Sequence, residues 1–285
     1  MKLYKAFIYL VLGLLSVLIL MPVLWVVMAS VKETAEHYGS PWALPTHIHW
    51  QNFVNAWTKA NMGGYMLHSV TVTGLALAIL LVVAVPASYC LARFHFVGRR
   101  FLNTCFMAGL FVNVNYIAVP IYLMLSDGDK WLKSMLGSPF LLNNHIIVAV
   151  VYAATALPFT IYLLTSYFST LPHDFEEAAY MDGAGYGRTM VKIILPMAKP
   201  SIITVILFNF LSFWNEYIII KTLVSDRDRW TLPAGLLNLM QAQQSAAEYG
   251  SMYAGLVLVM VPVLVLYICV QKNLTKGMTV GGLKG

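Results

Sequence analysis

Six apolar stretches, each about 20 residues long, are the feature that most constrains this chain. A helix needs about 20 mainly apolar residues to cross the hydrocarbon core of a membrane. The stretches are residues 8–28, 69–91, 101–125, 146–167, 202–220 and 253–269. Composition agrees, because only 11% of the residues are charged, whereas a soluble domain has about 25%. We therefore expect an all-α polytopic membrane protein, with six transmembrane helices in a single domain over residues 1–285.

Five of the six stretches contain an internal proline. These prolines are Pro22, Pro86, Pro120, Pro158 and Pro262. In water an interior proline costs a helix about 3 kcal/mol, but neighbouring helices in a membrane bundle can satisfy the freed carbonyl group. We interpret the prolines as kinks in a packed bundle. The first stretch is longer than the apolar core of about 7–15 residues in a signal peptide, so we expect it to be retained.

The basic residues predict the orientation of the chain. If both termini are cytoplasmic, 11 of the 18 Lys and Arg residues lie in cytoplasmic segments and 7 lie outside. Cytoplasmic loops of membrane proteins carry the excess of Lys and Arg. We expect a multi-pass protein of the cell (inner) membrane. The charge distribution predicts that both termini are cytoplasmic, and it gives no reason to invoke nucleic acid.

One long cytoplasmic loop is expected, at residues 169–200. Pro172 can open a helix, and Asp174 with its acidic neighbours suits the positive end of the helix dipole. Asp182-Gly183 is a turn signal, and Pro196 is expected to stop a second helical stretch. The loop is predicted to form two short helices hinged at a glycine.

Three segments of this loop resemble a known motif. Glu177-Ala178-Ala179, Asp182-Gly183-Ala184 and Ile194-Leu195-Pro196 are similar to the EAA loop of permease subunits in binding-protein-dependent ABC importers. The resemblance implies the type I importer permease fold, with this loop as the coupling loop that docks on an ATPase subunit. The coupling residues it implies are Glu177, Ala178, Ala179, Asp182, Gly183 and Ala184.

Further segments resemble carbohydrate-type permeases, in particular the second permease of maltose transporters. They are Phe213–Tyr217, Thr231–Pro233 with Gly235-Leu236, and the glycine-rich tail at 272–285. The resemblance implies a subunit of a sugar importer, with oligosaccharides as the expected substrates. It also implies a second permease as heterodimer partner, two ATPase subunits that carry ATP and Mg, and an extracytoplasmic solute-binding protein. Tail residues Gly281, Lys284 and Gly285 are expected at the ATPase.

Glu216 is the one formal charge placed within a predicted span, where a charge costs about 2.5–3.5 kcal/mol. On a continuous helix, Asn209, Ser212, Phe213 and Glu216 would share one face. That face is predicted to line the sugar pathway. The alternative is that these groups join helices or anchor the end of a span.

No enzyme activity or resident cofactor is expected in this chain. It has no convincing nucleophile–base pair and no metal-ligand spacing. The segment Gly183–Thr189 differs from a phosphate-binding loop, because Asp182 and Arg188 stand where that loop needs Gly and Lys. Two other functions remain open: a glycerol-3-phosphate-type ABC permease, and a stand-alone secondary transporter.

Overall fold

A computed structural model describes residues 2–246 and 249–282, which are mainly helical and contain no strand. The helical elements, in chain order, are α1 (Lys2–Ser30), α2 (Thr34–Gly39), α3 (Gln51–Thr58), α4 (Met62–Arg93), α5 (Arg99–Gly109), α6 (Val114–Leu136), α7 (His145–Phe168), α8 (Asp174–Met181), α9 (Tyr186–Thr189), the π-helical turn η1 (Met190–Ile194), α10 (Leu195–Trp214), α11 (Ile218–Leu223), the short 3₁₀ turn η2 (Arg227–Arg229), α12 (Leu232–Ala246) and α13 (Tyr249–Gly282).

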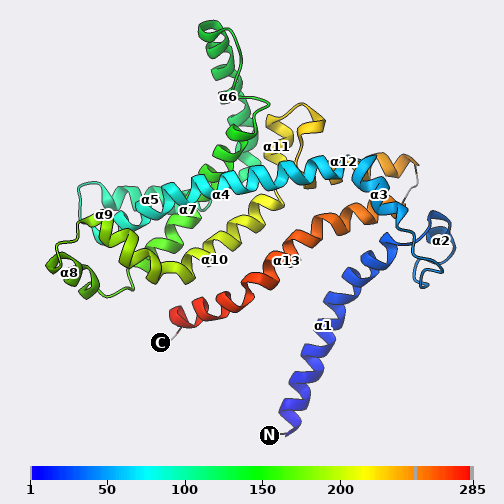
Figure 1. The fold of residues 1–285 in the computed structure, drawn as a ribbon, viewed down its shortest axis with the longest axis horizontal. Coiled ribbons are helices and arrows are strands. Elements are labelled where there is room, and N and C mark those ends of the chain that lie inside the picture. The colour runs from blue at the N-terminus through cyan, green and yellow to red at the C-terminus, as the bar shows by residue number, and fades with distance from the viewer. Residues whose placement is uncertain (1, 247–248, 283–285) are drawn as a thin grey trace. The chain divides into compact units, whose positions relative to one another are not determined.

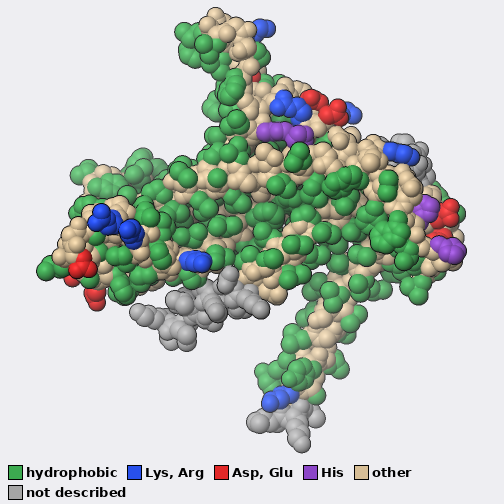
Figure 2. Space-filling view, viewed as in Figure 1, with side chains coloured by type: hydrophobic (Ala, Val, Ile, Leu, Met, Phe, Trp, Pro, Cys, Tyr) green, Lys and Arg blue, Asp and Glu red, His purple; other side chains and the backbone are tan. Residues whose placement is uncertain are grey.

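The long apolar helices agree with the sequence prediction in number. Within the described residues, five helical segments are long and apolar enough to cross a membrane, and a bent helix pair makes up to six. The five are Tyr4–Ser30, Met62–Arg93, His145–Phe168, Tyr186–Trp214 and Tyr249–Gln271. All five predicted internal prolines lie inside helices. Hydrophobic side chains run along the helices and charged side chains gather near their ends (Figure 2).

The span predicted at 101–125 is not one straight helix. The chain breaks between α5 and α6, which meet at an angle of 107°, and α6 turns away from α5 (Figure 1). Asn113 starts α6, because its side-chain oxygen accepts the N–H of Asn115 at 2.9 Å. A polar cap of this kind satisfies an otherwise unpaired N–H at a helix start. α5 ends at Gly109, where a Cβ would lie 2.8 Å from the Pro158 ring of α7.

The predicted stop at Pro196 is also wrong. α9, η1 and α10 follow one another without a break and form one segment from Tyr186 to Trp214. The N–H of Leu195 bonds to the carbonyl of Met190, five residues back. This wider turn comes just before Pro196, which has no N–H to donate. The same segment ends at Trp214, so the predicted span at 202–220 runs past its end.

The chain divides into two compact units. One consists of residues 67–231 and 263–285, and its core packs α4 and α7 against η1 and α10. The buried residues of this core are Val85, Tyr89, Leu164, Phe168, Ile194, Ala198 and Val205.

The other unit consists of residues 1–66 and 232–262. Its interior holds Lys32, whose ammonium donates to the carbonyls of Ser40 and Pro41 at 3.1 and 2.9 Å. Asn52 donates to the carbonyls of Ser30 and Lys32 at 3.0 and 2.8 Å. These bonds are needed because a buried polar group without a partner is costly. They tie the segment after α1 to α3.

Gly235 of α12 lies against the ring of Tyr65. A Cβ at this glycine would lie 2.0 Å from Cδ2 of the ring, far inside van der Waals contact. The structure thus gives a packing reason for a glycine at this position.

We predict that Gly235→Ala destabilises the protein by about 1–3 kcal/mol, the usual range for forcing an extra group into a packed core. Gly74→Ala is the matched control, because a Cβ at Gly74 of α4 meets nothing within 4 Å. The measurement is thermal unfolding of the purified protein in detergent. Equal melting temperatures for the two variants would contradict the packing argument.

Candidate functional site

The coupling loop predicted from the sequence contains the short helix α8. Asp174, Glu176 and Glu177 lie in its first turn, where acidic groups are favoured by the helix dipole. Glu177 and Ala178 are exposed, whereas Glu176 and Ala179 are buried. Of the predicted Glu-Ala-Ala triplet, only the first two side chains therefore face outward. Ala179 packs inside the chain and is not free to contact a partner.

α8 ends in a tight turn at Gly183. This glycine has a φ of +73°, a left-handed conformation that costs most L-residues about 1–2 kcal/mol. Its N–H donates to the carbonyl of Tyr180 at 3.0 Å, and the N–H of Ala184 donates to the carbonyl of Ala179 at 2.9 Å. This pair of bonds is a Schellman motif. The predicted glycine turn is therefore present, and it joins α8 to α9 in a defined direction.

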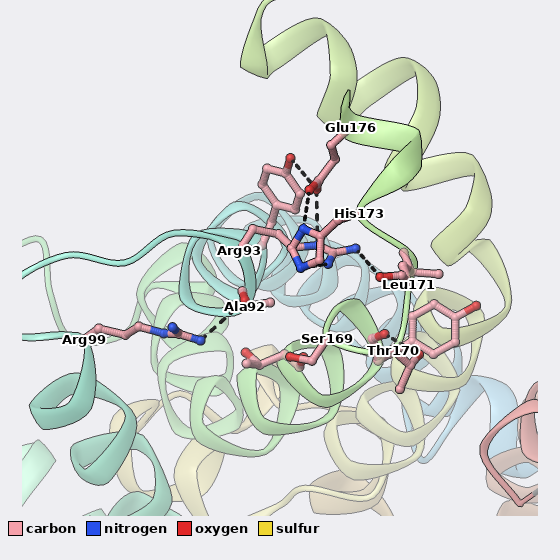
Figure 3. A network of polar contacts seen from close by, with 11 residues as sticks. Ala92, Arg93, Arg99, Ser169, Thr170, Leu171, His173 and Glu176 are labelled. Atoms are coloured by element: carbon pink, nitrogen blue, oxygen red, sulfur yellow. Dashed lines mark hydrogen bonds and ion pairs between the residues drawn. The ribbon is translucent and has the colours of Figure 1, made fainter. Parts of the chain in front are cut away.

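A buried ion pair anchors the other end of α8. Arg93, the last residue of α4, lies with its Nε 3.2 Å from Oε1 of Glu176, and the two side chains are only 2% and 10% exposed. The Tyr89 hydroxyl donates to the same carboxylate oxygen at 3.0 Å. Figure 3 shows Arg93, His173 and Glu176 converging at the start of α8. A buried charge is tolerated only when it is paired and hydrogen-bonded in this way.

His173 and Leu171 complete the anchor. Nη2 of Arg93 donates to the Leu171 carbonyl at 2.8 Å, and Nη1 lies 3.1 Å from Nε2 of His173. Because a guanidinium can only donate, Nε2 accepts. The proton of the neutral ring is then assigned to Nδ1, which lies 3.3 Å from Oε2 of Glu176. The chain entering α8 is thus fixed to the end of α4 at several points.

Sequence reasoning missed this anchor. Glu176 looks like a solvated acid of a first helical turn, and Arg93 looks like a positive charge at a span end. Tyr89 and Arg93 are four residues apart on one helix, so they face the same way. That spacing was the one signal of a shared site, but it did not identify a partner 83 positions away.

An aromatic pair lies beside the turn. The rings of Tyr180 and Tyr186 meet edge to face with centroids 5.1 Å apart. Desolvation, together with the hydrogen bond to Tyr186, raises the pKa of Tyr180 to about 12. Tyr180 therefore stays neutral at physiological pH, and it adds an apolar surface next to the exposed Met181.

The predicted pathway face does not exist as one surface. Ser212 is exposed, whereas Asn209 and Phe213 are buried. Asn209 donates to the Thr160 hydroxyl of α7 at 3.0 Å. Phe213 stacks on Tyr152 with ring centroids 5.5 Å apart. The two buried residues join α10 to α7, as the alternative interpretation expected.

Glu216 lies beyond the end of α10, so it cannot share a helical face with Asn209. Its Oε1 accepts the N–H groups of Ile218 and Ile219 at 2.8 and 2.9 Å, and its Oε2 accepts the Tyr152 hydroxyl at 2.7 Å. The carboxylate therefore caps the start of α11. This is the span-end anchor that the sequence left open.

The predicted tail residues are only partly described. Gly281 lies near the end of α13, and Lys284 and Gly285 lie outside the described residues. Their placement at an ATPase stays a prediction. Among the described residues, no group of three or more His, Cys, Asp or Glu side chains could hold a metal ion.

Two adjacent glutamates give a matched test of the anchor. We predict that Glu176→Gln destabilises the protein by about 3–5 kcal/mol, because it leaves the buried Arg93 charge unpaired. Glu177→Gln should change stability by less than about 0.5 kcal/mol, the usual effect of a surface substitution. Unfolding of both variants in detergent is the measurement. Equal stabilities would show that the ion pair does not hold α8.

Comparisons with known proteins agree with this architecture. Residues 84–280 match the family model described as "Binding-protein-dependent transport system inner membrane component". The diacetylchitobiose uptake system permease protein NgcG of Streptomyces coelicolor is 38% identical, over 93% of this chain and 84% of that protein. The galactooligosaccharides transport system permease protein GanQ of Bacillus subtilis is 29% identical, over 98% and 95%.

A solved structure supports the fold. It is a crystal structure of a bacterial ABC transporter involved in the import of alginate. One of its chains matches with a TM-score of 0.80 and 23% identity, covering 95% of this chain and 96% of that one. The family predicted from the loop motif is thus confirmed. The chain belongs to the family of inner-membrane components of binding-protein-dependent transport systems.

Proposed function

We propose that this chain is a permease subunit of an ATP-driven sugar importer and forms half of the translocation pathway. Support for the substrate class comes from relatives named for diacetylchitobiose, galactooligosaccharides and trehalose/maltose. An oligosaccharide or disaccharide is therefore the substrate we propose. A second permease, two ATPase subunits and an extracytoplasmic binding protein would complete the transporter. ATP and Mg would bind to the ATPase subunits.

One observation carries this proposal. In the coupling loop, α8 exposes one set of side chains to the outside, and its two ends are fixed to the rest of the chain. Phe175, Tyr180 and Met181 are 44%, 41% and 89% exposed, and the exposed Glu177 lies among them. Exposed apolar groups gathered at one place on a protein commonly mark a contact with another protein. We propose that this surface docks on an ATPase subunit and that the loop faces the cytoplasm, as do both termini.

The anchors explain how such docking would move the pathway. Glu176 ties the start of α8 to α4 through Arg93. The turn at Gly183 ties its end to α9, which continues as the membrane helix α10. A displacement of α8 would therefore be transmitted to two spans at once. In this scheme, ATP closes the ATPase subunits, α8 follows them, and the spans open outward to receive sugar from the binding protein.

The environment of Glu216 argues against the stand-alone secondary transporter. A coupling carboxylate must exchange its ion or proton during transport. Glu216 instead accepts three hydrogen bonds in the cap of α11. For glycerol-3-phosphate as substrate, we find no specific supporting observation, and it stays an alternative for the transport assay.

We predict that Glu177→Lys lowers both sugar uptake and recovery of the ATPase subunit with the permease, each at least about tenfold, because a repulsive interfacial charge costs more than 1.4 kcal/mol. The experiment compares uptake of labelled oligosaccharides, disaccharides and glycerol-3-phosphate by the complete transporter in membranes. Asp228→Lys is the control, because Asp228 is an exposed acid in the separate turn η2.

Normal uptake and normal ATPase recovery with Glu177→Lys would rule out the proposed docking surface. Uptake of glycerol-3-phosphate without uptake of any sugar would rule out the substrate class while leaving the coupling role intact. The two parts of the proposal can therefore fail separately.

A further inference from the structure

A cavity of about 550 Å³ lies between α5 and α7, and none of its lining residues belongs to the coupling anchor or to the buried Asn209 contact. Its lining residues come from most of the length of α5 and from the second half of α7. They are Arg99, Arg100, Asn103, Thr104, Phe106, Met107, Ile161, Tyr162, Thr165 and Ser166. None of them is acidic. The cavity therefore has a positive charge that no lining residue neutralises.

The positive end of the cavity lies at the start of α5. Arg99 donates to the carbonyls of Leu91 and Ala92 at 2.8 and 3.4 Å, and the bond to Ala92 is drawn in Figure 3. Arg100 is exposed and belongs to none of the ion pairs found among the described residues. The preceding Gly98 offers no side-chain cap, and the positive end of the α5 dipole adds to the attraction for an anion.

α7 contributes hydroxyl groups to the same end. Thr165 and Ser166 line the cavity opposite the arginines. Oγ1 of Thr165 is buried and has no hydrogen-bond partner among the described residues. Buried polar atoms are nearly always paired. Hydroxyl-bearing residues beside arginines in one cavity lining suit a ligand with acceptor oxygens.

Beyond Asn103 and Thr104, the α5 side of the cavity is apolar. Phe106 lies seven residues after Arg99, about 10 Å further along α5, and Met107 follows it. On α7, Ile161 and Tyr162 lie one turn before Thr165. The lining thus changes from cationic and hydroxylic to apolar along both helices. A free phosphate ion would need only the polar end, and a neutral sugar would not need the arginines.

We propose that this cavity binds an anionic phospholipid from the leaflet on the coupling-loop side. Arg100, Arg99 and the α7 hydroxyls hold the phosphate, and an acyl chain lies along Phe106, Met107 and Ile161. Basic pockets between membrane helices are suited to such headgroups. Arg99 also bonds to the end of α4, so the proposed headgroup would lie against a residue that is linked to the helix end carrying Arg93. The proposal does not depend on which substrate is transported.

The test uses the complete purified transporter in nanodiscs of phosphatidylcholine with increasing phosphatidylglycerol, followed by native mass spectrometry of the retained lipids. We expect selective retention of phosphatidylglycerol. Arg100→Gln should reduce it about fivefold, the effect expected for one basic residue at a lipid headgroup. Thr165→Val should also reduce it. Arg188→Gln is the matched control, because Arg188 is an exposed arginine of α9 outside the cavity.

Retention that is equal in the wild type, Arg100→Gln and Arg188→Gln would overturn the proposal. Equal retention of phosphatidylcholine and phosphatidylglycerol would also overturn it. A free phosphate ion could bind to the same groups as a phospholipid headgroup. Addition of inorganic phosphate distinguishes these two ligands. Loss of the bound lipid at millimolar phosphate would identify a phosphate-ion site, and persistence of the lipid would support the phospholipid site.

Discussion

The buried ion pair between Arg93 and Glu176 is the interaction on which the proposed mechanism depends. Both charges lie where helix dipoles favour them, the cation at the end of α4 and the anion at the start of α8. Tyr89, His173 and the Leu171 carbonyl add further hydrogen bonds to the pair. Without these partners the desolvation penalty of two buried charges would exceed their attraction. With them, a helix of only eight residues, too short to be stable by itself in water, is held in one place.

The two ends of α8 are fixed by different physical means. The start is held by charge, and the end is held by the backbone conformation of Gly183. These attachments lead to different spans, α4 and the segment that continues into α10. The surface between them presents Glu177 and Ala178 outward. A partner that pulled on this surface would act on both spans, which is the behaviour expected of a coupling element in an ATP-driven importer.

Much of the fold could be predicted from the sequence, because apolar length and charge act locally. The apolar stretches, the helical prolines and the turn at Gly183 all follow from properties of neighbouring residues. The predictions failed where the structure depends on residues far apart in the chain or on backbone hydrogen-bond geometry. The break before Asn113 and the π-helical turn before Pro196 depend on hydrogen-bond geometry that apolar patterns do not encode. Sequence patterns could not identify what holds Glu176 and Glu216, because their partners Arg93 and Tyr152 lie 83 and 64 positions away in the chain.

The central claim is that α8 moves together with the end of α4. Its most direct measurement is the distance between spin labels on the native, exposed Cys90 of α4 and on Met181→Cys of α8, with Cys105 and Cys269 replaced by serine. The complete transporter would be compared in its nucleotide-free and ATP-bound states. The account predicts the same narrow distance distribution in both states, and a broad one in Glu176→Gln. A shift between the two states by more than one helical turn, about 5.4 Å, in the protein with Glu176 intact would contradict it.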